Sequence, residues 1–246
     1  WAQQFQDLQK LESITERMLS LLQEWGFVKI SGGERSEETD RKKGREIKTD
    51  FVAASSLEKN KERGTGPKLN PTALGKRISE LYLDPLTAKH LLNCLHSFNT
   101  KNTEQNNEKN GPFSLLQMIC HTLELRPLLR VKIKEQEFIQ EELTKRCHSL
   151  LEEEPDVYDL DYEEFLDSFK TALFLEAWIN EKDEDYLMDK FDIRPGEIRV
   201  KLEVADWLLY AAEELAALSD HKSVIKEIRK LRIRVKHGTK EELLPL

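Results

Sequence analysis

Apolar residues recur every three or four positions along most of this chain, which is the spacing of one face of an α-helix. A helix over 198–216 would bury the clearest of these stripes: Ile198, Leu202, Ala205, Leu209, Ala212 and Ala216. Each residue turns a helix by about 100°, so Trp207 points away from the stripe, near Val200 and Tyr210. The pattern therefore predicts a large aromatic ring on the outer side of this helix.

The same periodicity predicts a mostly helical protein. Helices are expected over these ranges: 8–25, 73–82, 84–95, 113–122, 135–151, 162–180, 185–191, 195–216 and 221–236. Residues 27–30 are aromatic and β-branched and predict a strand, and 68–70 predict the strand that returns beside it. Asp84 and Pro85 suit a helix start, because Asp caps free N–H groups and Pro fits the first helical position.

The order of these elements predicts two domains. Residues 1–84 fit a winged-helix module with a small two-stranded wing, and 85–246 fit a multi-helix bundle. Residues 31–67 separate the two strands, are rich in charge and have almost no apolar periodicity. We therefore expect a flexible charged insertion in the wing. An Asn-rich loop is expected over 99–110.

Composition narrows the class of protein. Of 246 residues, 39% are hydrophobic and 34% charged, which predicts a water-soluble globular chain with a real core. No stretch approaches the roughly 18 apolar residues of a membrane span, and no secretory signal is recognisable. Three cysteines do not make a paired framework, so we expect a reducing, intracellular setting. The first residue is Trp rather than Met, which suggests a piece of a longer protein.

Motifs for catalysis are missing from the sequence. The run from Gly64 to Lys68 lacks the spacing of a phosphate-binding loop, and no nucleophile elbow or zinc-protease motif occurs. Three Cys–His pairs invite a metal hypothesis: Cys94 with His96, Cys120 with His121, and Cys147 with His148. Adjacent residues on a helix diverge by about 100°, so we expect neither a metal site nor a catalytic site here.

Two interpretations of Trp207 stay open. The ring can pack against a second layer of the fold or a partner protein, as large apolar side chains usually do. It can also stack on unpaired bases. Grooves that bind single-stranded nucleic acid use aromatic rings in this way, beside cationic side chains. On the second interpretation the candidate DNA-binding residues are Trp207, Arg199, Lys201, Tyr210, Lys226, Arg229 and Lys230.

The net charge of −8 argues weakly against nucleic acid, but its distribution matters more than the sum. Acidic residues concentrate over 152–164, and basic residues concentrate over 222–236. The basic helix either faces phosphates or pairs with the acidic run of the same chain.

Five stretches resemble, in the same order, parts of a known family. They include Thr72 to Ala88, Phe113 to Leu129, Lys170 to Glu181, Pro195 to Leu208 and Arg234 to Leu244. Each stretch is weakly specific, but together they resemble the C-terminal half of archaeal superfamily-two, Ski-like DNA helicases of the Hjm type. That resemblance implies a winged helix followed by a helical "ratchet" bundle that ends at the start of a further C-terminal domain.

The resemblance also implies a function. ATP and Mg²⁺ would bind to two motor domains that precede Trp1, and no cofactor would bind this fragment. The intact monomeric protein would move 3′–5′ on single-stranded and forked DNA, within the cell and beside the chromosome. Trp207 stands where the family stacks a base. Val200 stands where the family has a basic residue, although Arg199 and Lys201 flank it. The alternative function is a helical protein–protein interaction module without nucleic-acid binding.

Overall fold

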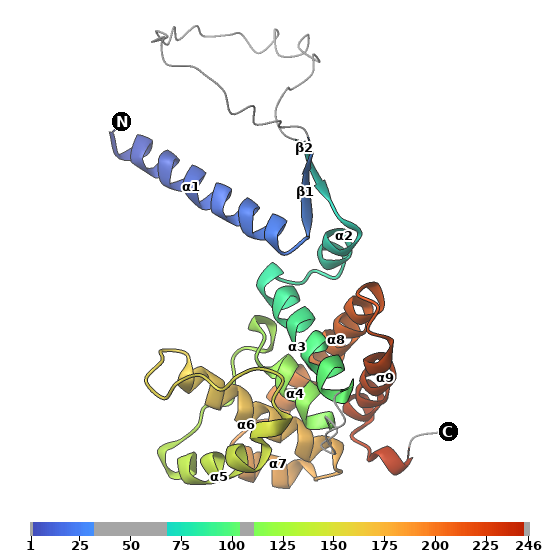
Figure 1. Ribbon diagram of the computed structural model, residues 1–246. Helices are drawn as coiled ribbons and strands as arrows, with labels where there is room; N and C mark the ends of the chain where they lie inside the picture. The colour runs from blue at the N-terminus through green and yellow to red at the C-terminus, as the bar shows by residue number, and fades with distance from the viewer. Residues whose placement is uncertain (1, 32–67, 104–110, 244–246) are drawn as a thin grey trace, which may run out of the picture. The chain divides into compact units, whose positions relative to one another are not determined.

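The computed structural model describes residues 2–31, 68–103 and 111–243 (Figure 1). The chain forms two compact units, 1–76 and 77–246. The division falls within a helix, eight residues before the start of the predicted second domain at 85. Apart from Ser31, the predicted insertion over 31–67 lies outside the described residues.

The first unit is a helix, a two-stranded antiparallel ribbon and the start of a second helix. Its elements are α1 (Ala2–Glu24), β1 (Val28–Ser31), β2 (Lys68–Pro71) and α2 (Ala73–Glu80), the last of which continues into the second unit. In the ribbon, Val28 pairs with Pro71 and Ser31 pairs with Lys68. Both predicted strands are therefore present, in the register of a short hairpin-like wing.

A close backbone approach fixes the start of α2. Thr72 caps this helix, since its hydroxyl oxygen accepts a hydrogen bond from the Gly75 N–H at 3.0 Å. The Thr72 N–H donates to the Phe27 carbonyl at 2.9 Å. A Cβ atom on Gly75 would lie 2.0 Å from that same carbonyl oxygen, so only glycine fits.

The predicted apolar stripe of α1 is largely uncovered in this chain. Leu8, Leu11, Ile14 and Met18 are between 40% and 60% exposed. Since exposed apolar stripes of this length are unusual on isolated soluble domains, this face of α1 is a surface that a partner could cover.

The second unit is a helical bundle. Its elements in chain order are α3 (Pro85–Thr103), α4 (Pro112–Cys120), η2 (Leu123–Leu125), η3 (Ile133–Glu135), α5 (Gln136–Arg146), η4 (Cys147–Ser149), α6 (Tyr162–Ile179), α7 (Glu184–Phe191), α8 (Pro195–Leu218), α9 (Lys222–His237) and η5 (Glu241–Leu243). A mostly α fold with a two-stranded wing and a helical bundle confirms the predicted fold class. Within the described part of the chain, no helix combines the length and apolar character that crossing a membrane requires.

Two predicted boundaries are wrong. The helix that begins at Pro85 continues to Thr103, because Phe98 is buried in the core and keeps the helix packed beyond the expected loop start at residue 99. The helix predicted over 135–151 begins with the turn η3 and ends at Arg146, where the backbone tightens into η4. The expected cap at Asp84 is present, since its carboxylate accepts a hydrogen bond from the Leu86 N–H at 2.8 Å.

The core of the bundle is built around α4. Every residue from Phe113 to Cys120 is buried, which means that this helix has neighbours on all sides. It packs against α6, where the rings of Phe113 and Phe169 meet edge to face with centroids 5.3 Å apart. Helices α8 and α9 lie against each other beside this core (Figure 1).

Replacing Gly75 by alanine tests the close approach at the start of α2. We expect Gly75→Ala to cost about 1–3 kcal/mol of local stability, the usual cost of overpacking, because its Cβ would collide with the Phe27 carbonyl. Faster hydrogen exchange of the Thr72 and Gly75 amides would report this loss. Gly196→Ala is the matched control, since nothing lies within 4 Å of a Cβ there. Equal exchange in both variants would contradict the packing argument.

Candidate nucleic-acid interface

Helix α8 is buried on one side and partly open on the other. The predicted stripe is buried, except that Leu202 is only partly covered, and Leu208 and Leu215 widen it. The opposite side, which we call the outer face of α8, consists of Val200, Glu203, Trp207, Tyr210 and Glu214. Val200 is 59% exposed and Trp207 is partly exposed. The ring of Trp207 is therefore not sealed within the core.

Two arginines hold Tyr210 on this face. The Arg77 guanidinium donates a hydrogen bond to the Tyr210 hydroxyl at 3.3 Å. The Arg232 guanidinium lies 4.9 Å from the centroid of the same ring, which is a cation–π distance. Tyr210 and Trp207 are three residues apart and so lie on the same side of the helix. The outer face of α8 thus presents two neighbouring aromatic rings beside guanidinium groups.

Carboxylates pair with these arginines. Arg77 forms an ion pair with Glu214 at 2.8 Å, and Arg232 forms one with Asp206 at 2.8 Å. All four side chains are between 29% and 36% exposed, so water weakens each pair. The middle of α8 is consequently a polar but nearly charge-neutral aromatic surface.

A hollow of about 860 Å³ opens at the N-terminal end of α8. Val200 and Val204 line it from α8, and five cationic residues line it from outside this helix: Arg126, Arg130, Lys132, Lys170 and Arg194. Acidic residues also contribute, and one of them, Asp192, forms an ion pair with Lys132. We call this site the basic hollow. Since Val200, Val204 and Trp207 follow one another at steps of four and three, the hollow and the indole share one side of the helix.

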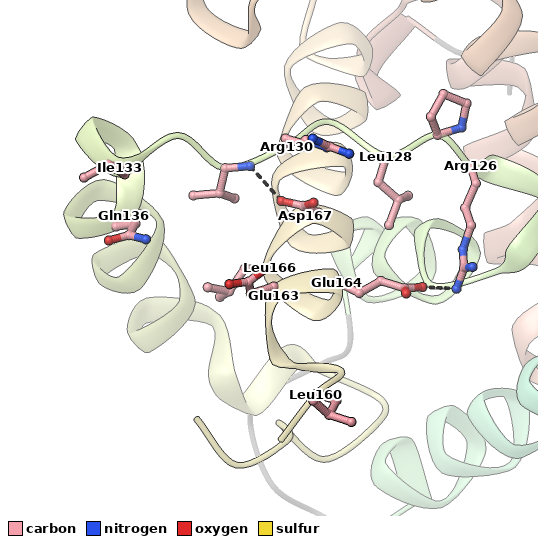
Figure 2. A pocket seen from close by; sticks show the side chains of 12 residues that line it. Arg126, Leu128, Arg130, Ile133, Gln136, Leu160, Glu163, Glu164, Leu166 and Asp167 are labelled. Carbon is pink, nitrogen blue, oxygen red and sulfur yellow. Dashed lines mark hydrogen bonds and ion pairs between the residues drawn. The ribbon is translucent and has the colours of Figure 1, made fainter. Parts of the chain in front are cut away.

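The segment that carries three of these cations is fixed to α6. The Asp167 carboxylate accepts a hydrogen bond from the Val131 N–H at 2.7 Å, and burial raises the pKa of this carboxyl. Figure 2 shows this contact from the side of a second hollow, where Arg126 reaches the Glu164 carboxylate. The buried Lys170 ammonium donates to the Arg130 carbonyl at 2.9 Å and to Glu135 at 2.7 Å. The cations therefore project from a rigid support.

Most of the predicted DNA-binding cations have acidic partners in the structure. Arg199 is 82% exposed and pairs with Glu203 at 3.1 Å. On α9, Arg229 pairs with Glu213 at 2.5 Å, Lys230 pairs with Glu241 at 3.2 Å, and Lys226 is exposed. The acidic partners of Arg229 and Lys230 lie outside 152–164. These two residues therefore do not support the alternative in which the basic helix pairs with that acidic run.

Lys201 does not face solvent. Its side chain is buried, and its ammonium donates hydrogen bonds to the carbonyls of Pro127 at 2.5 Å and Leu125 at 3.4 Å. Burial lowers the pKa of this amine. A lysine held in this way joins α8 to the segment after η2, so we leave Lys201 out of the candidate interface.

Sequence reasoning missed the basic hollow. Arg126, Arg130 and Lys132 occur in a short stretch, and their density was the available signal. Their convergence with Arg194 on the N-terminal end of α8 depends on how the chain after α4 folds back, which periodicity does not reveal. The interface also lies close to Val200, the position at which the resemblance to the helicase family implied a basic residue.

Of the three Cys–His pairs seen in the sequence, one is in contact in the structure, with Cys147 Sγ 3.4 Å from His148 Nδ1. His96 faces the His221 ring at 6.0 Å, Cys120 is fully buried, and Cys147 lies exposed beside His148. Burial raises the pKa of the Cys120 thiol. Cys94 instead lies beside His90 and Glu152, in a grouping that could hold a metal ion. The expectation that no metal ligands converge rested on sequence neighbours alone and did not consider this grouping.

The fold and the site together define a mostly helical protein in which a small winged unit is followed by a bundle with an aromatic face. Residues 113–238, just over half of the chain, match the family described as archaeal helicase, domain 4. The chain belongs to this family. The matched region contains α4, the basic hollow, α8 and α9, and therefore the whole candidate interface apart from Arg77.

Relatives extend the match toward the N-terminus. The chain is 38% identical over 184 residues to the ATP-dependent DNA helicase Hel308 of Pyrococcus abyssi, which covers 73% of this chain and 24% of the relative. It is 39% identical to Hel308 of Pyrococcus horikoshii and 40% identical to Hel308 of Methanocaldococcus jannaschii, over 70% and 72% of this chain and 23% and 13% of the relatives. The chain thus spans a quarter or less of these relatives.

Truncating Lys201 separates its packing role from DNA binding. We expect Lys201→Ala to lower the free energy of unfolding by about 1–3 kcal/mol, because two buried carbonyls lose their donor. Urea unfolding followed by circular dichroism measures this cost. Affinity for a single-stranded oligonucleotide should stay within twofold of wild type at a temperature where the variant is folded. A selective loss of affinity with unchanged stability would return Lys201 to the interface.

Proposed function

We propose that this chain is the part of an ATP-dependent DNA helicase that guides single-stranded DNA along the outer face of α8. The observation that carries the proposal is the partly exposed Trp207, aligned along one helix with Val200 and the basic hollow. Membership in the archaeal helicase family and the names of the relatives support DNA as the ligand.

The geometry suits a strand of a few nucleotides. Val200 and Trp207 are seven residues apart, which is about 10 Å along a helix. At a stacked spacing of about 3.4 Å, roughly three nucleotides would extend from the basic hollow to the indole. Phosphates would meet Arg130 and Arg194 at one end of this path, and a base would stack on Trp207 at the other.

Stacking would supply most of the grip. A base stacked on an aromatic side chain contributes about 1–3 kcal/mol, whatever its identity. Arg77 and Arg232 already have carboxylate partners, so phosphates near Tyr210 would compete with Glu214 and Asp206 for them. The expected interaction is therefore independent of base sequence and only moderately sensitive to salt. Such a contact can resist backward slipping between motor steps and still release the strand.

Other parts of the intact helicase would supply the chemistry. We infer that ATP and Mg²⁺ bind motor domains outside this chain, and that the intact protein acts inside the cell as a monomer. Movement 3′–5′ and unwinding of forked DNA follow from the resemblance to Hjm-type helicases. The exposed stripe of α1, which includes Leu8 and Leu11, offers a surface for the protein's own motor domains.

Truncating Trp207 tests the stacking contact. We expect Trp207→Ala to weaken binding of a labelled single-stranded oligonucleotide by about 5- to 140-fold, the equivalent of 1–3 kcal/mol, measured by fluorescence anisotropy at low salt. Because the ring is only partly buried, we expect a stability loss below the roughly 3–5 kcal/mol of a fully buried Trp. Trp207→Phe should retain most of the affinity.

Tyr158→Ala is the matched control for this test, because Tyr158 is an aromatic residue 95% exposed on a loop away from α8. Its replacement should leave affinity unchanged. If Trp207→Ala keeps full affinity and instead loses several kcal/mol of stability, the indole belongs to the packed core. The alternative of a protein–protein interaction module would then be preferred.

Salt dependence tests the basic hollow. We expect Arg130→Ala or Arg194→Ala to reduce the slope of log affinity against log salt by about 0.7 each, as one phosphate contact on a single strand is lost. Lys222→Ala is the control, since Lys222 is 83% exposed at the far end of α8's neighbour α9. Identical slopes for all three variants would contradict a strand path through the hollow.

A further inference from the structure

Three side chains that can ligate a metal ion come together beside α3, and a fourth, His121, contacts one of them. His90 and Cys94 lie one turn apart on α3, His121 follows α4, and Glu152 follows η4. The Glu152 carboxylate bridges two histidines: one oxygen is 2.6 Å from His90 Nδ1 and the other is 3.1 Å from His121 Nδ1. The Cys94 sulfur lies 3.9 Å from His90 Nδ1.

We propose that His90, Cys94 and Glu152 form a binding site for a Zn²⁺ ion, which would join α3 to the chain after η4, with His121 holding the second carboxylate oxygen. The proposed DNA contact does not involve these residues. The inference is therefore independent of the proposed function.

The carbonyl of Met118 prepares His90 to act as a ligand. It lies 2.7 Å from His90 Nε2, which must donate a proton to it. In a neutral imidazole the other nitrogen, Nδ1, is then unprotonated and carries a lone pair. That nitrogen is 2.6 Å from Glu152, while the Cys94 sulfur is nearly equidistant from the two ring nitrogens, at 3.9 Å from Nδ1 and 4.0 Å from Nε2. Zinc-binding histidines characteristically donate their second N–H to a backbone carbonyl in this manner.

The alternative occupant of this position is a proton. A charged His90 would donate from both nitrogens, to Met118 and to Glu152. Burial opposes that charge, but the hydrogen bond that His90 donates to Glu152 outweighs it and raises the pKa of His90. Burial likewise opposes ionisation of Glu152, while His121 and His90 lower the pKa of this carboxyl to about 2.

Two separations can be compared with those of a tetrahedral zinc site. With Zn–S near 2.3 Å and Zn–N near 2.0–2.1 Å, a sulfur and a nitrogen ligand would lie about 3.6 Å apart, and the observed separation is 3.9 Å. An oxygen and a nitrogen ligand would lie about 3.3 Å apart. The Glu152 oxygen that faces His90 is 2.6 Å from Nδ1, so this contact must lengthen by less than 1 Å.

The chemistry of the donors favours zinc over harder ions. One sulfur, one imidazole nitrogen and one carboxylate form a set that suits Zn²⁺, whereas Mg²⁺ and Ca²⁺ prefer oxygen ligands. Cys94 is buried, while His121 and Glu152 are 29% and 35% exposed, so an ion can enter from solvent. Gln117 lines the same small cavity, and its carbonyl oxygen is buried without a partner among the described residues. It can accept a hydrogen bond from a further ligand or water.

Cobalt substitution gives a direct test on the 246-residue chain. Co²⁺ added to metal-free protein should bind at one equivalent and produce the thiolate-to-cobalt charge-transfer band and the intense visible bands of a tetrahedral site. Zn²⁺ should displace it and abolish these bands. Zn²⁺ should also raise the melting temperature of the metal-free chain, whereas Mg²⁺ should not.

Variants locate the ion. Cys94→Ser should abolish the charge-transfer band, and Glu152→Gln should weaken zinc binding at least tenfold, since even loss of an indirect partner of a metal site costs about 10- to 100-fold. Cys147→Ser is the matched control, because Cys147 is an exposed thiol beside His148, where adventitious binding would occur. This variant should retain the band and the stoichiometry.

Several results would overturn the proposal. One is the absence of a charge-transfer band in the wild-type chain, and another is a band that survives Cys94→Ser but disappears in Cys147→Ser. Circular dichroism establishes that each variant is folded. If Cys94→Ser does not fold, Glu152→Gln and His121→Asn carry the test at partly exposed positions. Unchanged zinc affinity in both would then reject the site.

Discussion

One-sided burial of α8 is the constraint on which the proposed interface depends. Its inner side packs into the core through residues such as Ala205 and Leu209, which fixes the rotation of the helix about its axis. Because that rotation is fixed, the outer side must carry Val200, Trp207 and Tyr210. The arginines around Tyr210 and the hollow beside Val200 lie beside the aromatic rings only in this orientation. A helix free to rotate could not hold an aromatic ring in line with a row of cations.

Periodicity in the sequence was sufficient to predict α8, its buried stripe and the outward position of Trp207. It also gave the two strands of the wing, because a turn glycine and β-branched residues mark β1 locally. It failed for contacts made between distant segments. Lys201 looked like a surface cation from its flanking position, yet the carbonyls of Pro127 and Leu125, more than 70 residues away, hold its ammonium. Sequence spacing carries no information about such a contact.

The same limitation explains the two groupings that were missed. The basic hollow brings residues 126–132 together with Arg194. The proposed zinc site brings His90 together with Glu152, which lies 62 residues further along the chain. In both groupings, backbone carbonyls and hydrogen-bonded carboxylates position the side chains. The local sequence shows only ordinary helix positions there.

The charge of α9 was overestimated for a related reason. This helix is strongly basic in sequence, but acidic residues on α8 and η5 pair with several of its cations. Its surface is therefore less positive than its composition suggests.

The end of α9 has a further consequence. Gly238 takes a left-handed conformation there, and a Cβ would lie 2.9 Å from the ring of Trp178. The indole N–H of Trp178 donates to the Val235 carbonyl at 2.7 Å, so this ring is clamped between α6 and the helix terminus. Trp178 and Trp207 are both partly exposed, but the Trp178 indole N–H is held in this hydrogen bond. Emission from Trp178 is therefore an internal reference, against which changes in the emission of Trp207 can be read.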